Sequence, residues 1–140
     1  MSLALLSGAL NALFMTPRSD WYHSLKMPSV SPAFHSAAWL ICYIAFAVVF
    51  AEFLSEKELR KYLWATVPFP VGNALWCAVF FRLHNAVAAL VILCALCLAM
   101  VFLTVITVRK TKIACFAAIF PLSHYIFLTG LNIMIVIFNT

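Results

Sequence analysis

Residues 86–108, AVAALVILCALCLAMVFLTVITV, form a run in which no side chain is charged and threonine is the only polar residue type. The hydrocarbon core of a bilayer is roughly 30 Å thick, and about 20 apolar residues in a helix cross it. Four further apolar stretches accompany this run, so the sequence predicts an all-α polytopic membrane protein, a single five-helix bundle over residues 1–140. The expected spans are about residues 3–17, 37–54, 62–81, 86–108 and 113–138.

The composition of the whole chain also indicates a membrane protein. Apolar residues make up 66% of it and charged residues 9%, against about 45–50% and roughly 25% in soluble domains. A water-soluble fold would leave large apolar patches in water. The net charge of +5 comes from the loops, which favours membrane lipids with anionic headgroups as partners. No basic stripe interleaved with aromatic residues is present, so a nucleic-acid partner is not expected.

The first span is the shortest, and two interpretations of it stay open. Residues 3–15 are short for a membrane crossing, and a signal peptide is the alternative, although no basic segment precedes them. Small residues such as Gly8 and Ala12 favour a retained helix packed closely against a neighbour.

The basic loop residues predict the orientation of the bundle. The loops after the second and fourth spans together hold six lysines and arginines, and the opposite side holds three. Because cytoplasmic loops carry an excess of Lys and Arg, the side with six, and with it the N-terminus, is expected to face the cytoplasm.

The sequence shows no pattern typical of catalysis or metal binding. All five cysteines lie inside expected spans, and although Cys94 and Cys97 share a helix face, zinc needs four ligands. We interpret the cysteines as small packing residues. No serine–histidine–carboxylate set, HExxH motif or glycine-rich phosphate loop occurs. Pumps carry ionisable groups within their spans, where this chain has only Glu52 and His124. We therefore predict no catalytic residue, no metal site and no obligatory cofactor.

Three spans combine aromatic rings with neutral polar side chains at spacings of three and four residues, which place side chains on one helix face. The sets are Trp39 and Tyr43 in the second span, Asn73, Trp76 and Phe80 in the third, and His124, Leu128 and Asn132 in the fifth. Polar groups among flat rings suit a large planar apolar ligand. The alternative is that the rings are interfacial anchors or core residues and the asparagines join neighbouring helices.

The loop before the second span is unusually apolar. Residues 21–32 read WYHSLKMPSVSP, an aromatic pair followed by two prolines that stiffen the chain. Leaving these rings in water costs free energy, so the loop is expected to fold over the mouth of the bundle as a lid.

Residues of four segments fall at the spacing of one ordered set of motifs. They are Trp21, Tyr22, Leu25, Pro28 and Pro32 in the loop, Trp39 and Tyr43 in the second span, Asn73, Trp76, Phe80 and Phe81 in the third, and Pro121, Leu131, Asn132 and Asn139 in the fifth. This set resembles the TspO/MBR family, the tryptophan-rich sensory proteins that include the mitochondrial translocator protein. The family loop is W-Y-x-x-L-x-K-P-x-x-x-P-P, and here Met27 replaces its lysine and Ala33 its last proline.

The resemblance implies a pocket beneath the first loop that binds a porphyrin- or haem-type tetrapyrrole, or a sterol, for sensing, sequestration or transport. It places ligand contacts at Trp21, Tyr22, Pro28, Trp39, Tyr43, Asn73, Trp76, Phe80, His124, Tyr125 and Asn132. It also implies a homodimer in the bacterial envelope or the mitochondrial outer membrane, with porphyrin or haem as a ligand.

The chain departs from the family pattern in ways that keep two alternatives open. The fifth-span tryptophan is missing; Tyr125 occupies its place counting from Pro121, and His124 counting back from Asn132. This loss disfavours the porphyrin-degrading activity proposed for some members. Positions that are often polar in the family hold Phe69 and Ile92, which favours the other alternative, a membrane interaction subunit whose cavity is filled by its own side chains.

Overall fold

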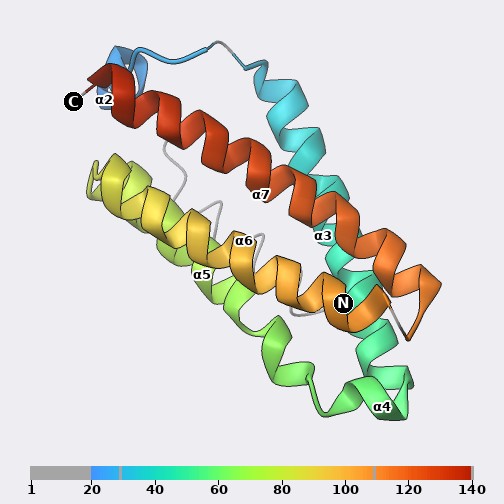
Figure 1. Ribbon diagram of the computed structural model, residues 1–140. Coiled ribbons are helices and arrows are strands. Elements are labelled where there is room, and N and C mark those ends of the chain that lie inside the picture. The colour runs from blue at the N-terminus through green and yellow to red at the C-terminus, as the bar shows by residue number, and fades with distance from the viewer. Residues whose placement is uncertain (1–19, 29, 109, 140) are drawn as a thin grey trace.

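The computed structural model describes residues 20–28, 30–108 and 110–139 (Figure 1). Within those ranges the regular secondary structure is helical and no strand occurs. Four helical runs are long and apolar enough to cross a bilayer, namely Ala33–Ser55, Leu63–Arg82, Ala86–Val108 and Lys112–Asn139. The expected first span, residues 3–17, lies outside the described residues. Helices long and apolar enough to cross a bilayer are therefore present at four of the five expected spans, and the first span stays a prediction.

The helix bounds agree closely with those expected from the apolar runs. α6 (Ala86–Val108) has the expected limits, and α7 (Lys112–Asn139) is one residue longer at each end. α3 (Pro32–Ser55) begins at Pro32 and not at residue 37. Proline suits the first turn of a helix because its φ is already helical and its missing N–H needs no partner there.

The third span is a composite and not the single helix expected over residues 62–81. After the short α4 (Lys57–Arg60), it consists of the 3₁₀ turn η1 (Leu63–Thr66), α5 (Pro68–Cys77) and the π-helical turn η2 (Ala78–Arg82). In η2 the chain makes one wide turn, so that the N–H of Leu83 donates to the carbonyl oxygen of Ala78 at 3.1 Å. Wide turns of this kind are often found at functional sites.

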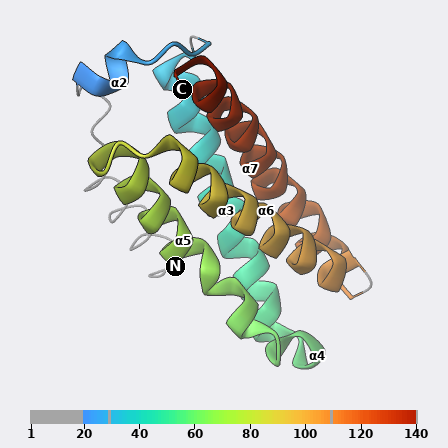
Figure 2. The ribbon, with the colours of Figure 1, turned by 60° about the vertical axis from the view of Figure 1, so that its left-hand side comes forward.

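The long helices pack in the order α3, α7, α6, α5 (Figures 1 and 2). α5 and α6 approach closely at Gly72, where a Cβ atom would lie 2.6 Å from Leu96 Cδ2. The short α2 (Asp20–Ser24) lies at the end of the bundle where η2 turns into α6 and α7 terminates, and α4 lies at the opposite end (Figure 2).

Side chains are distributed as expected for a bundle surrounded by lipid. Val49, Phe53, Leu93, Met100 and Leu103 are fully buried between the helices. Large apolar side chains also cover the outside, as in Leu98, which is 71% exposed. Because lipid tails are as apolar as these side chains, their exposure costs nothing within a bilayer.

Candidate ligand site

The site begins with aromatic contacts that join α3, α5 and α7. The Trp39 ring stacks on Tyr43, with centroids 5.6 Å apart, and lies 6.4 Å from the Trp76 ring. The His124 ring meets Trp39 edge-on at 4.8 Å. The three sets that the spacing placed on separate helix faces therefore converge, and α3, α5 and α7 each contribute to one cluster.

The aromatic contacts continue from this cluster to α2. Trp76 stacks on Phe80 at 5.6 Å, and Phe80 meets the edge of Trp21 at 5.3 Å. Trp21 in turn stacks on His84 at 4.5 Å. We call the rings of Tyr43, Trp39, Trp76, Phe80 and Trp21 the aromatic series. It runs from the middle of α3 to the segment outside the spans.

The π turn of η2 explains how the series reaches α2. Phe80 and Phe81 are consecutive, yet both are buried. Phe80 packs on Trp21, and the Phe81 ring lies 5.6 Å from Tyr22. The Trp21–Tyr22 pair therefore packs on the Phe80–Phe81 pair, and this contact docks the loop on the third span.

The segment 20–28, which we call the lid, is also fastened to the last helix. The backbone N–H of Lys26 donates to Asn139 Oδ1 at 2.9 Å, and Asn139 Nδ2 donates to the carbonyl oxygen of Lys26 at 3.0 Å. Leu25 and Met27 pack against the buried core, so a methionine fits where the family has lysine. The lid expected from the sequence thus lies over this end of the bundle.

Two hydrogen bonds position polar groups within the site. The Tyr125 hydroxyl donates to Asn73 Oδ1 at 2.9 Å, and both residues are buried. Trp39 Nε1 lies 3.1 Å from His35 Nε2, to which it donates. The first bond joins α7 to α5, and the second fixes the Trp39 ring on its own helix.

Other buried polar atoms of the site have no hydrogen-bond partner among the described residues. They are Trp76 Nε1, His124 Nε2 and both amide atoms of Asn132. Asn132 lies on the same face of α7 as His124, toward the lid. A buried polar atom without a partner costs about 1–3 kcal/mol, so these atoms can hydrogen-bond a polar ligand edge at little further desolvation cost.

The structure separates the two candidates for the missing fifth-span tryptophan. His124 faces Trp39, and its ring lies 6.1 Å from His35. Tyr125 is turned toward α5, where it bonds Asn73 and its ring lies 6.1 Å from Phe69. His124 is therefore the residue that neighbours the second-span tryptophan.

The predicted site residues differ in how far they take part in this arrangement. Asn73, Trp76, Phe80, His124, Tyr125 and Asn132 are buried, whereas Trp21, Tyr22, Trp39 and Tyr43 are partly buried. Pro28 is exposed in the linker between α2 and α3 and contributes no ring to the series.

Sequence reasoning missed His35 and His84. His35 could have been found, because it precedes Trp39 by four residues and shares its helix face. His84 lies in the turn between η2 and α6 with a φ of 52°. No local pattern indicates its stacking on Trp21, which only the docking of the lid creates.

Apolar spans around an aromatic and polar interior, with a loop docked at one end, define a polytopic helical membrane protein. The family model described as the TspO/MBR family matches residues 1–137, and the chain belongs to that family. No curated protein matches the chain.

Proposed function

We propose that the protein binds a planar hydrophobic ligand of the porphyrin or haem type, or a sterol, beneath the lid, and that it senses, sequesters or transports this ligand. The observation that carries the proposal is that the aromatic series meets buried polar atoms on α5 and α7 that have no hydrogen-bond partner within the described part of the chain. Large apolar ligands are held by such sites, in which a few polar groups determine the orientation.

The rings offer stacking surface for a macrocycle. Trp39 is partly buried, and its ring contacts the rings of Tyr43 and Trp76. A ligand that separates them replaces each contact by another aromatic contact, worth about 0.5–1.5 kcal/mol beyond area burial. His124 Nε2 and the Asn132 amide then face the ligand edge.

Opening and closing of the lid would control the entry of the ligand into the site. The docking of the lid depends on ring contacts with Phe80 and Phe81 and on the bonds between Lys26 and Asn139. These contacts can open without unfolding a span, because the lid lies outside all four described spans. Opening of the lid would admit a ligand from the membrane surface.

The test is a protoporphyrin titration of the detergent-purified protein in the dark, followed by quenching of tryptophan fluorescence. We expect saturable binding in the micromolar range or tighter, weakened severalfold by Trp39→Phe and by Asn73→Ala. Trp64→Phe is the matched control, because Trp64 is 63% exposed near the opposite end of the bundle. Non-saturable quenching, or equal affinity in all variants, would refute the proposal. A parallel illuminated sample reports whether porphyrin is consumed.

The alternative is a ligand-independent interaction subunit, and one observation favours it. Trp76 and Phe80 are 4% and 3% exposed, and Asn73 is already satisfied by Tyr125. The interior is thus largely filled by its own side chains. If no saturable quenching occurs with protoporphyrin or with a fluorescent sterol, this alternative becomes the leading one.

A further inference from the structure

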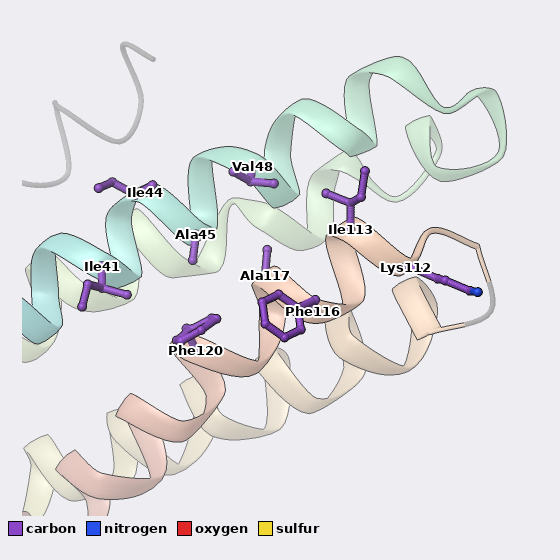
Figure 3. A pocket seen from close by; sticks show the side chains of 9 residues that line it. All are labelled: Ile41, Ile44, Ala45, Val48, Lys112, Ile113, Phe116, Ala117 and Phe120. Atoms are coloured by element: carbon purple, nitrogen blue, oxygen red, sulfur yellow. The ribbon is translucent and has the colours of Figure 1, made fainter.

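A groove lies on the outer side of the bundle, between α3 and the N-terminal part of α7 (Figure 3). Its volume is about 550 Å³. Ala45 and Ala117 are buried and form its floor, where α3 and α7 approach each other. Ile44 and Phe116, 59% and 66% exposed, stand at its sides. The two alanines leave a hollow because they are too small to fill the space between the larger flanking side chains.

Among the described residues that line the groove, only Lys112 has a polar side chain. It lies at the end of the groove beyond Ile113, and its ammonium group points away from the apolar floor (Figure 3). A lysine in this position buries its alkyl stem along apolar surface and keeps its charge at the membrane interface. The groove therefore combines an apolar lining with the cationic side chain of Lys112 at its end.

Lys112 differs from the nearby Lys110 in its ion-pair partners. Lys110 forms an ion pair with Glu58 of α4, and this lysine holds the pKa of the Glu58 carboxyl below its usual range. Within residues 20–28, 30–108 and 110–139, no ion pair involves Lys112. Its charge is thus available to an external anion.

We propose that this groove binds one acyl chain of an anionic phospholipid from the adjacent leaflet, with the lipid phosphate on the Lys112 ammonium. The apolar lining alone selects nothing, because every lipid tail is equally apolar. The Lys112 ammonium group would provide selectivity for anionic over neutral lipid, since a basic residue near the membrane surface raises the affinity for anionic lipid roughly fivefold.

The test is native mass spectrometry of the delipidated full chain in detergent, with equimolar dioleoyl phosphatidylglycerol and dioleoyl phosphatidylcholine. The two lipids share their chains and differ in the headgroup. We expect an excess of phosphatidylglycerol adducts, which Lys112→Gln lowers roughly fivefold. Lys57→Gln, a matched change on the exposed α4, should preserve the excess. Ile44→Trp, which fills the groove from its exposed side, should lower the occupancy by both lipids.

Four results would overturn the proposal, provided that circular dichroism shows each variant to be helical. Equal adducts of the two lipids would remove the role of the cation. Equal losses in Lys112→Gln and Lys57→Gln would indicate diffuse attraction by this end of the bundle. Unchanged occupancy in Ile44→Trp would place the lipid elsewhere. A dimer that Ile44→Trp abolishes would identify a second copy of the chain as the occupant.

Discussion

Tyr125 and Asn73 form a buried polar contact between α7 and α5. The hydroxyl of Tyr125 is 2.9 Å from Asn73 Oδ1, and both residues are less than one-tenth exposed. Neither group has water as an alternative partner within a bilayer. The contact should therefore contribute to the association of α5 with α7.

Replacing Tyr125 by Phe should destabilise the bundle by about 0.6–1.7 kcal/mol, the range for interhelical hydrogen bonds in membrane proteins. The free energy of unfolding by a denaturing detergent measures this loss. Tyr62→Phe serves as the control, because the Tyr62 ring lies beneath the Lys61 ammonium and keeps that contact as Phe. The double variant Tyr125→Phe/Asn73→Leu should lose less than the two single changes together, and strict additivity would contradict the hydrogen bond.

Tyr22 makes the docking of the lid sensitive to alkaline pH. Burial raises the pKa of the Tyr22 phenol above its usual value, which is about 10 in an unfolded chain. Because the pKa is raised in the docked state, the contribution to docking is complete below about pH 10 and is lost as the pH rises through the raised value. Hydrogen exchange of residues 20–28 should therefore accelerate beyond the intrinsic pH effect. Tyr22→Phe should abolish the additional acceleration, and an identical profile in that variant would refute the assignment.

The two glycines within the described helices, Gly72 and Gly130, differ in how closely a neighbouring helix packs against them. Gly72 lets α5 approach α6, since a Cβ there would lie 2.6 Å from the Leu96 side chain, which is buried. Gly130 on α7 has no heavy atom within 4 Å of the corresponding position. The two glycines thus differ in their surroundings although both are within helices.

Alanine at these two glycines should have opposite effects. Gly72→Ala should lower the stability by about 1–3 kcal/mol through overpacking, less the gain in helix propensity. Gly130→Ala should be neutral or stabilising by up to about 1 kcal/mol. Thermal unfolding in detergent, followed by circular dichroism, measures both. Equal shifts in the two variants would show that propensity alone governs them.

In the whole molecule, the lid and the last helix close the described chain on itself. The Asn139 side chain accepts from the backbone of Lys26 and donates to it, across a sequence separation of 113 residues. Each exposed hydrogen bond contributes about 0.5–1.5 kcal/mol. Two together can keep the lid docked for most of the time.

Asn139→Ala should therefore undock the lid without unfolding the spans. We expect amide exchange of residues 20–28 to rise roughly fivefold or more, and bound protoporphyrin to dissociate faster by a similar factor. Asn85→Ala is the control, because Asn85 caps α6 at the same end through the N–H of Ala88 at 2.9 Å. If amide exchange of residues 20–28 is equally fast in both variants, the hydrogen bonds between Lys26 and Asn139 are not what holds the lid in place.

The sequence alone indicated the four spans that the structure describes, because a helix in a bilayer must satisfy its backbone locally. An apolar run such as 86–108 therefore defines its own limits, and α6 has them. The spacing of Trp39, Trp76 and His124 likewise indicated which helix face each occupies. The composite third span, with its 3₁₀ turn η1 and its π turn η2, and the early start of α3 at Pro32 escaped this reasoning. The wide turn of η2 serves the docking of the lid and not the crossing.

Tertiary structure decided which of those faces meet. The stacking of Trp21 on His84, the choice of His124 over Tyr125 as the neighbour of Trp39, and the clasp of Lys26 by Asn139 all join segments far apart in the chain. The groove above Ala45 and Ala117 exists because two small residues on different helices lie opposite each other. Local periodicity places a side chain on a face, but the packing of helices within an equally apolar solvent depends on shape complementarity between non-neighbouring residues.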